Sequence, residues 1–169
     1  PKKMQPHLTK LKANGIYATL GNHDLFGDQD RIDREIRKAG ITVLRDETLT
    51  LNNELVLIGR NDNLAHDRPT TETLLKQVNT DLPIILLDHR PTDIEKHASL
   101  PLDIQVSGHA HKGQVFPANL ITKMIIVLDY GHERIGNPHV FVTSGYGFWG
   151  IPMRLGSQSE VVIIDVKGK

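Results

Sequence analysis

Residues 83–89 have the sequence Pro-Ile-Ile-Leu-Leu-Asp-His, in which consecutive aliphatic side chains are bounded by Pro83 and Asp88. A short, continuous apolar run with such boundaries is typical of a strand that is buried on both faces of a sheet. Both faces are covered in this way mainly where strands run parallel and helices connect them. The stretch therefore predicts a central strand over residues 83–87 in an α/β fold.

The same pattern recurs on both sides of this stretch. Residues 16–20 form a mostly apolar run that leads into Gly21, and residues 103–107 repeat the pattern on a smaller scale and lead into Gly108. Further strands are predicted over residues 41–44, 55–59, 139–144 and 160–166. A helix is predicted to begin after Asp28, a good N-cap residue, and to end at Gly40, and a second helix covers about residues 71–78. We predict a single domain over residues 1–169, with a mixed β-sheet sandwich flanked by helices.

Composition limits the partners and the metal chemistry of the chain. The 20 Lys and Arg residues equal the 20 Asp and Glu residues, so no overall basic field attracts nucleic acid, and no nucleic-acid partner is expected. The chain has no cysteine, so a metal would have nitrogen and oxygen ligands. The longest apolar runs are far shorter than the ~20 residues that cross a bilayer, and we expect this segment to be soluble.

Polar loops with histidine follow directly on three of the predicted strands. These loops are residues 21–24 (Gly-Asn-His-Asp), 88–91 (Asp-His-Arg-Pro) and 108–111 (Gly-His-Ala-His). Ligands of open α/β sheets bind at the carboxyl ends of strands, so three such loops are expected to meet in one crevice. His109 and His111 are separated by one residue, and each is placed to serve one metal of a close pair, whose ions lie ~3.5–4 Å apart.

Each loop alone has a simpler explanation. A single histidine such as His89 at a strand end is more often packed or solvated than bound to a metal. Asn and Asp are common in turns because their side chains hydrogen-bond to the nearby backbone. The occurrence of all three loops after successive buried strands favours a metal site over these explanations.

The loop sequences Gly21-Asn22-His23-Asp24, Leu87-Asp88-His89 and 108–114 (Gly-His-Ala-His-Lys-Gly-Gln) resemble, in order, the third to fifth blocks of calcineurin-like metallophosphoesterases. Residues 144–147, 152–155 and 159–161 are similar to the tail of a bacterial, often membrane-anchored branch of that family. The resemblance implies metal-dependent hydrolysis of phosphate mono- or diesters.

The resemblance also implies roles for individual residues. Asn22, His89 and His109 would bind one divalent metal, and His111 would bind the other, with Mn, Fe, Zn and Ni all left open. His23 would be the general acid of the reaction, and Asp24 would orient its imidazole. The whole protein is expected at a membrane or in the cytoplasm.

The first two blocks of the family, Asp-x-His and Gly-Asp-x-x-Asp, do not occur in the sequence. The chain therefore resembles an N-terminally truncated, C-terminal portion of the family's domain, with weak or single metal occupancy and little activity expected. A sheet edge left bare on the side of residues 1–20 is expected to allow self-association.

Several other residues leave alternatives open. Asp62 is expected to form a turn in preference to reaching the rim of the site, and Arg154 to pair with a carboxylate in preference to a substrate phosphate. Phe148 and Trp149 either wall a pocket or complete the core. The remaining histidines are treated as non-ligands: His7, His66, His97, His132 and His139.

Three functions compete at this point. The first is a phosphoesterase with a dinuclear metal site, and the second is a non-catalytic scaffold with the same fold that binds metal or protein. The third is a short protein with one metal. A retained His23 favours the enzyme, because a scaffold has no use for a general acid.

Overall fold

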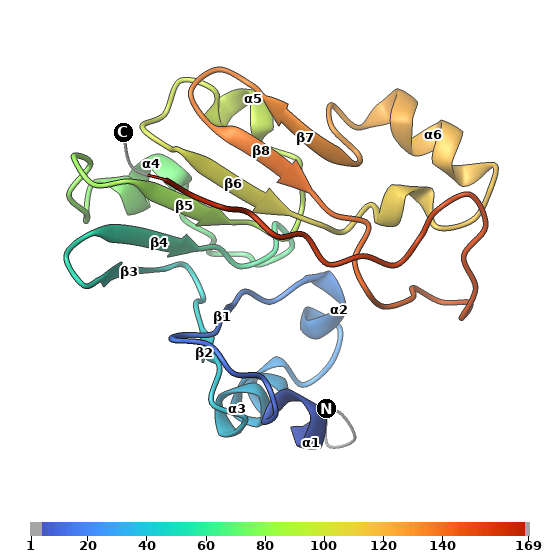
Figure 1. The fold of residues 1–169 in the computed structure, drawn as a ribbon, viewed down its shortest axis with the longest axis horizontal. Coiled ribbons are helices and arrows are strands. Elements are labelled where there is room, and N and C mark those ends of the chain that lie inside the picture. Colours follow the sequence, from blue (N-terminus) through green and yellow to red (C-terminus); the bar gives the residue numbers. More distant parts are fainter. Residues whose placement is uncertain (1–4, 168–169) are drawn as a thin grey trace.

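A computed structural model describes residues 5–167, and its main feature is a six-stranded mixed sheet with the order β3-β4-β5-β6-β8-β7 (Figure 1). The strands are β3 (Glu47–Leu51), β4 (Leu55–Gly59), β5 (Ile84–Leu87), β6 (Ile104–Ser107), β7 (Gly131–Arg134) and β8 (His139–Val142). Strands β4, β5, β6 and β8 run parallel, while β3 and β7 form antiparallel edges. The predicted fold class, a mixed sheet flanked by helices, is confirmed.

The central strands form because their aliphatic side chains are covered on one face by helices. Helices α4 (Thr71–Leu75) and α5 (Ile94–His97) lie on this face. One cluster of buried side chains joins β4 and β5 to α4, and a second joins Ile94 to Val140 and Val142 of β8. The parallel strands are thereby held in register, and their carboxyl ends lie along one edge.

The N-terminal part of the described chain forms a smaller layer below this sheet in Figure 1. It contains α1 (Gln5–Leu8), α2 (Asn22–Leu25), α3 (Gln29–Lys38) and a two-stranded parallel sheet of β1 (Tyr17–Ala18) and β2 (Thr42–Val43). The predicted N-cap of α3 is confirmed, because Asp28 accepts a hydrogen bond of 2.9 Å from the Arg31 backbone N–H.

One predicted strand is wrong. Residues 160–166 are extended but form no strand, and Val161 and Ile163 are exposed. Alternating side chains give a strand only where an edge is available for pairing. In the part of the chain that is described, the sheet ends at β3 and β7, and residues 160–166 pair with neither edge.

Two strands and several short helical elements were not predicted. Strand β3 forms a hairpin with β4 through residues 52–54, since Leu51 pairs with Leu55, and Asn52 and Asn53 have the positive φ common in hairpin turns. The other unpredicted elements include β7, α2, α5, the 3₁₀ turn η1 (His111–Gly113) and α6 (Ala118–Ile125). Helix α4 is shorter than predicted and ends at Leu75.

Two expectations remain predictions. The single domain over residues 1–169 and self-association through the edge at residues 1–20 are both untested, and residues 1–4 lie outside the described range. No helix within residues 5–167 is both long enough and apolar enough to cross a membrane.

Candidate metal centre

The three histidine loops converge on one point. The Nε2 atom of His89, which follows β5, lies 3.0 Å from Oδ1 of Asn22 in α2. The same Nε2 atom lies 3.2 Å from Nδ1 of His109, which follows β6. Three candidate ligand atoms from segments far apart in sequence therefore face one another, as the placement of the loops predicts.

Gly21 makes this approach possible. A Cβ atom at position 21 would lie 2.7 Å from Cε1 and 2.8 Å from Nε2 of the His89 imidazole, far inside normal contact. The His89 ring therefore packs against the bare backbone of Gly21. Asn22 begins α2 directly after this glycine and is buried, so its amide oxygen is held beside His89.

The glycine-histidine loop after β6 has an unusual backbone. Positive φ values occur at four of its residues that carry a Cβ atom, a backbone conformation that such residues rarely adopt. The φ values are 67° at His109, 49° at His111, 52° at Lys112 and 51° at Gln114. The Gly108 backbone N–H donates to His89 O at 3.0 Å, which ties this loop to the loop after β5. Such strain is held only where surrounding contacts determine it, and it gathers at functional sites.

His111 is oriented by the loop that follows β8. Its Nδ1 atom donates to the Ser144 carbonyl at 3.1 Å, so the tautomer with a proton on Nδ1 leaves Nε2 with a free lone pair. A hydrogen bond from one ring nitrogen to a carbonyl is the usual way in which a protein fixes a metal-binding imidazole. His111 thus has the protonation that a ligand requires.

Arg154 supports this orientation and corrects the expectation made for it. Its Nη2 atom donates to the carbonyls of Ser144, Gly145 and Gly147 at 2.8, 2.9 and 2.6 Å. Among the described residues it pairs with no carboxylate. The guanidinium instead holds together the turn whose Ser144 carbonyl accepts from His111.

His23 and Asp24 take different positions. His23 is exposed, and its ring contacts Phe26 and Trp149 edge-on, with centroids 6.0 and 6.5 Å away. The Asp24 carboxylate accepts from the Gly21 backbone N–H at 2.8 Å and forms no hydrogen bond with His23 in this structure. Consecutive residues of a helical turn do not face each other, so Asp24 shapes the loop and does not contact the His23 ring.

Burial keeps the candidate ligands neutral. Desolvation is the main cause that lowers the pKa of His89, and it lowers the pKa of His109 to about 4, with the nearby Arg90 adding to the shift. Desolvation and then the charge of Arg154 lower the pKa of His111. Only neutral imidazole has a lone pair for a metal, so all three side chains are in the binding form at neutral pH.

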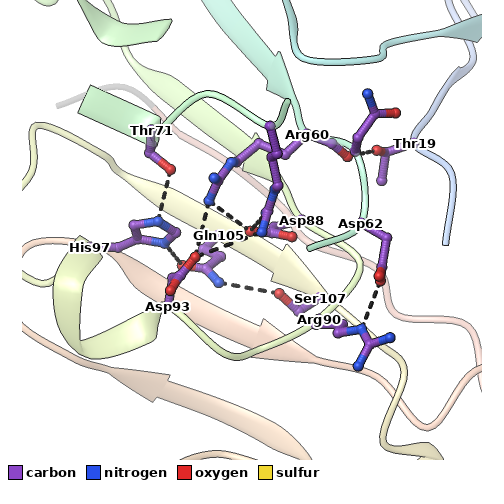
Figure 2. Close-up of polar contacts among 12 residues, drawn as sticks. Thr19, Arg60, Asp62, Thr71, Asp88, Arg90, Asp93, His97, Gln105 and Ser107 are labelled. Atoms are coloured by element: carbon purple, nitrogen blue, oxygen red, sulfur yellow. Dashed lines mark hydrogen bonds and ion pairs between the residues drawn. The ribbon is translucent and has the colours of Figure 1, made fainter. Parts of the chain in front are cut away.

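A buried ion-pair network surrounds Asp88, the residue before His89 (Figure 2). Asp88, 1% exposed, accepts from Arg60 at 3.3 Å and from Arg68 at 2.6 Å, and Asp93 also pairs with both arginines. Burial raises the pKa of Asp88, and the two guanidinium groups oppose this shift. The network fixes the residue next to His89 and links the ends of β4 and β5.

Asp88, Asp93 and His97 also have ligand atoms within 4.8 Å of one another. However, the carboxylates already bind guanidinium groups. The two ring nitrogens of His97 lie 2.8 Å from Thr71 Oγ1 and 2.8 Å from Gln105 Oε1. We therefore interpret this cluster as a structural ion-pair network, which agrees with the treatment of His97 as a non-ligand.

Asp62 is fully buried and does form a turn, since it accepts from the Leu64 backbone N–H at 3.1 Å. It also pairs with Nε of Arg90 at 2.8 Å. This pair spans the loops after β4 and β5 and steadies the segment that carries His89.

A cavity of about 460 Å³ opens over the candidate ligands. Its polar lining residues include Asn22, His23 and the three histidines that follow β5 and β6, and its apolar lining residues include Phe26, Ile126 and Trp149. Trp149 thus walls a pocket, one of the two alternatives left open by the sequence.

Sequence reasoning missed Gln114, which is buried and holds Trp149 in place. Its Oε1 accepts from the Trp149 backbone N–H at 2.6 Å, and its Nε2 donates to the Trp149 carbonyl at 2.6 Å. The sequence signal for Gln114 is its place at the end of the glycine-histidine motif. Its partner Trp149 lies 35 residues further along the chain, so the contact between them could not be predicted.

The donor atoms fit a divalent cation. Ligand atoms bound ~2.1 Å from one ion lie about 3–3.5 Å apart, which matches the 3.0 and 3.2 Å separations around His89 Nε2. Two neutral imidazoles and an amide oxygen suit Zn²⁺, Ni²⁺, Fe or Mn²⁺ better than Ca²⁺, which prefers oxygen alone.

The mixed sheet with ligands at its strand ends agrees with solved structures. The chain superimposes on a putative 5'-nucleotidase from Staphylococcus aureus with a TM-score of 0.54, at 14% identity, over 86% of this chain and 35% of that protein. At this identity the likeness shows the fold alone. No protein-family profile matches the chain.

Sequence relatives carry the assignment further. The chain is 37% identical over 162 residues to an uncharacterized metallophosphoesterase of Aquifex aeolicus, covering 92% of this chain and 62% of that protein. It is 32% identical over 171 residues to one of Bacillus subtilis, covering 96% and 60%. It is 36% identical over 166 residues to a transmembrane protein with metallophosphoesterase domain of Bos taurus, covering 87% and 37%.

The chain belongs to the metallophosphoesterase family, which confirms the family that its loops resemble. It spans less than two thirds of the length of these relatives.

Proposed function

We propose that the whole protein hydrolyses phosphate mono- or diesters with divalent metal ions, and that this chain supplies one side of the site. The observation that carries the proposal is the convergence of Asn22 Oδ1, His89 Nε2 and His109 Nδ1 at 3.0 and 3.2 Å. His111, held through Nδ1 by the Ser144 carbonyl, would bind a second ion. Bound cations would polarise the phosphoryl oxygens and lower the pKa of a bound water.

Residues of this chain would supply the general acid and hold it in position. His23 lines the cavity and forms no hydrogen bond with other described side chains, so its imidazole can donate a proton to the leaving oxygen. Phe26 and Trp149 contact its ring and limit its rotation. Asp24 keeps the turn in shape through Gly21, and it acts on His23 only as a positioning residue.

The number of ligands predicts how this chain behaves alone. Three candidate ligands face one ion, and His111 is the single candidate for a second, with no bridging carboxylate among the described residues that line the cavity. We propose that the chain alone binds one Zn²⁺, Ni²⁺ or Mn²⁺ ion with little turnover. Among the described residues, no contact specifically favours the second function, a scaffold without turnover.

The test is hydrolysis of a chromogenic phosphodiester by the whole protein with added Mn²⁺. His23→Ala should lower kcat by about 10²–10⁴-fold, the usual contribution of a general acid, with metal content unchanged. His66→Ala, at an exposed histidine outside the cavity, is the matched control and should keep wild-type turnover. Equal turnover of the two variants would remove His23 from the proposed role.

A further inference from the structure

Helix α6 has its polar and apolar faces reversed relative to a normal surface helix. Leu120, Ile121, Met124 and Ile125 point outward, and Met124 and Ile125 are 85% and 74% exposed. A surface helix of a globular protein normally turns such residues toward the core. Here the apolar stripe of α6 faces away from the protein.

Polar residues occupy the inward face of α6. Thr122 donates from Oγ1 to Asp129 Oδ2 at 2.7 Å, and Asn119 lies against Gly156, with its Nδ2 atom 3.5 Å from a Cβ built on that glycine. These contacts fix the rotation of the helix about its axis. The outward direction of the apolar residues is therefore determined by the protein and is not a result of loose packing.

A second segment adds apolar side chains beside α6. Trp149, Ile151 and Met153 are each about half exposed, on the loop that follows β8. Gln114 donates to the carbonyls of Trp149 and Ile151 at 2.6 and 3.0 Å, and the Phe116 backbone N–H donates to Leu155 O at 2.7 Å. The loop is thereby attached to the segment that leads into α6.

These two segments form one surface, the α6–loop surface, which consists of residues 116–127 and 146–155. Figure 1 shows α6 and this loop at the same end of the molecule. Ala118, Thr122 and Ile126 at one side and Trp149 at the other line the cavity that contains the candidate ligands. The α6–loop surface and the cavity therefore share these four residues.

Charge distinguishes this surface from the rest of the chain. Residues 110–128 and 144–159 contain Lys112, Lys123 and Arg154 but no Asp or Glu, although the whole chain has zero formal net charge. Lys123 is exposed on α6 itself, between Ile121 and Met124. An apolar face with aromatic residues and an exposed lysine, with no Asp or Glu within its own two segments, matches the surface of an anionic lipid bilayer.

We propose that the α6–loop surface docks on anionic lipid bilayers, with Ile121, Met124 and Ile125 inserted among the acyl chains and Lys123 at the headgroups. This proposal goes beyond the proposed phosphoesterase activity and does not depend on it. Docking would hold the cavity, which shares Trp149 and residues of α6 with this surface, close to the bilayer. A phosphoester with an apolar group could then enter without leaving the bilayer.

The chain provides its own probe, because Trp149 is its only tryptophan and lies on the proposed surface. The experiment mixes the 169-residue chain with vesicles of phosphatidylcholine and phosphatidylglycerol and records Trp149 emission. We expect a shift to shorter wavelength, quenching by lipids brominated on the acyl chain, and weaker binding as salt is raised or phosphatidylglycerol is left out.

Matched variants make the test specific. Met124→Asp combined with Ile125→Asp should weaken vesicle binding about tenfold or more. The reason is that burial of a single aliphatic side chain already contributes enough free energy to change an affinity about tenfold. Val161→Asp combined with Ile163→Asp changes two equally exposed residues on the C-terminal segment and should bind like wild type. Circular dichroism confirms that both variants are folded.

Three results would overturn the proposal. The first is a Trp149 emission spectrum that vesicles leave unchanged, and the second is an equal loss of vesicle binding in both double variants. The third is the absence of vesicle binding together with concentration-dependent dimerisation in light scattering, where Met124→Asp/Ile125→Asp abolishes the dimer. The last result would assign the surface to a second copy of this chain. Because no arm measures hydrolysis, failure here leaves the proposed function unaffected.

Discussion

Replacement of Gly21 by alanine tests whether the His89 imidazole needs a bare backbone beside it. Gly21 has φ −106° and ψ 177°, an extended conformation that alanine adopts without strain. The added Cβ would lie 2.7 Å from His89 Cε1, whereas carbon atoms pack at about 3.5 Å, so the ring must move by roughly 0.8 Å. Metal ligands tolerate deviations of only about 0.2 Å.

We therefore expect Gly21→Ala to lower the affinity of the chain for Zn²⁺ about 10–100-fold, the range seen when the support of a metal ligand is lost. Overpacking should also cost about 1–3 kcal/mol of the free energy of unfolding. Isothermal titration calorimetry measures the affinity, and urea denaturation measures the stability.

Gly27→Ala is the matched control for this prediction. A Cβ at position 27 would meet only Ile32 Cδ1 at 3.8 Å and Asp24 O at 3.9 Å, both ordinary contacts. This variant should bind Zn²⁺ like wild type. If Gly21→Ala also keeps wild-type affinity, His89 is not held as a ligand in the way that the structure indicates.

Two further predictions concern stability. Asp88→Asn leaves the buried guanidinium groups of Arg60 and Arg68 without their shared carboxylate and should destabilise the fold by about 3–5 kcal/mol in urea denaturation; a change below about 1 kcal/mol would show that Asp93 alone balances both charges. Burial raises the pKa of Glu160, but the hydrogen bonds that its carboxylate accepts outweigh burial, so the pKa lies below 4.5. The strongest of these hydrogen bonds comes from the Ser144 backbone N–H. The wild type thus has this stabilisation above about pH 4.5 and loses it as the pH falls through the lowered pKa. Glu160→Gln should be less stable by about 1 kcal/mol at pH 7, a value limited by solvent screening, and the difference should vanish in acid; an equal difference at pH 7 and pH 3 would contradict the assignment.

The sequence predicted the features that depend on local pattern. The runs before Asp88 and Gly108 are the parallel neighbours β5 and β6, and because they share a sheet edge, the convergence of His89 and His109 followed from topology. Asn22 follows β1 of the separate two-stranded sheet, so its approach to His89 depends on how the two sheets pack. The N-cap at Asp28 was predicted for the same reason, since a cap depends on residues within one turn.

Features that depend on distant partners could not be predicted. The alternation in residues 160–166 is compatible with a strand, but whether an edge is free to pair is decided by the rest of the sheet. Gln114 and Trp149, 35 residues apart, meet only in the folded chain. Asp24 was expected beside the His23 ring from the family resemblance, whereas the helical turn of α2 directs its carboxylate to the Gly21 backbone N–H.

The measurement that tests the central claim most directly is X-ray absorption at the zinc edge of the chain loaded with one equivalent of Zn²⁺. The structure predicts two imidazole nitrogens and at least one oxygen at ~2.0–2.2 Å, with high-affinity binding lost in His89→Ala/His109→Ala. The control is His132→Ala/His139→Ala, which removes another close pair, with ring nitrogens 3.0 Å apart and exposed on β7 and β8, and should leave the spectrum unchanged. A spectrum that changes only in the control would place the metal elsewhere and contradict the proposed centre.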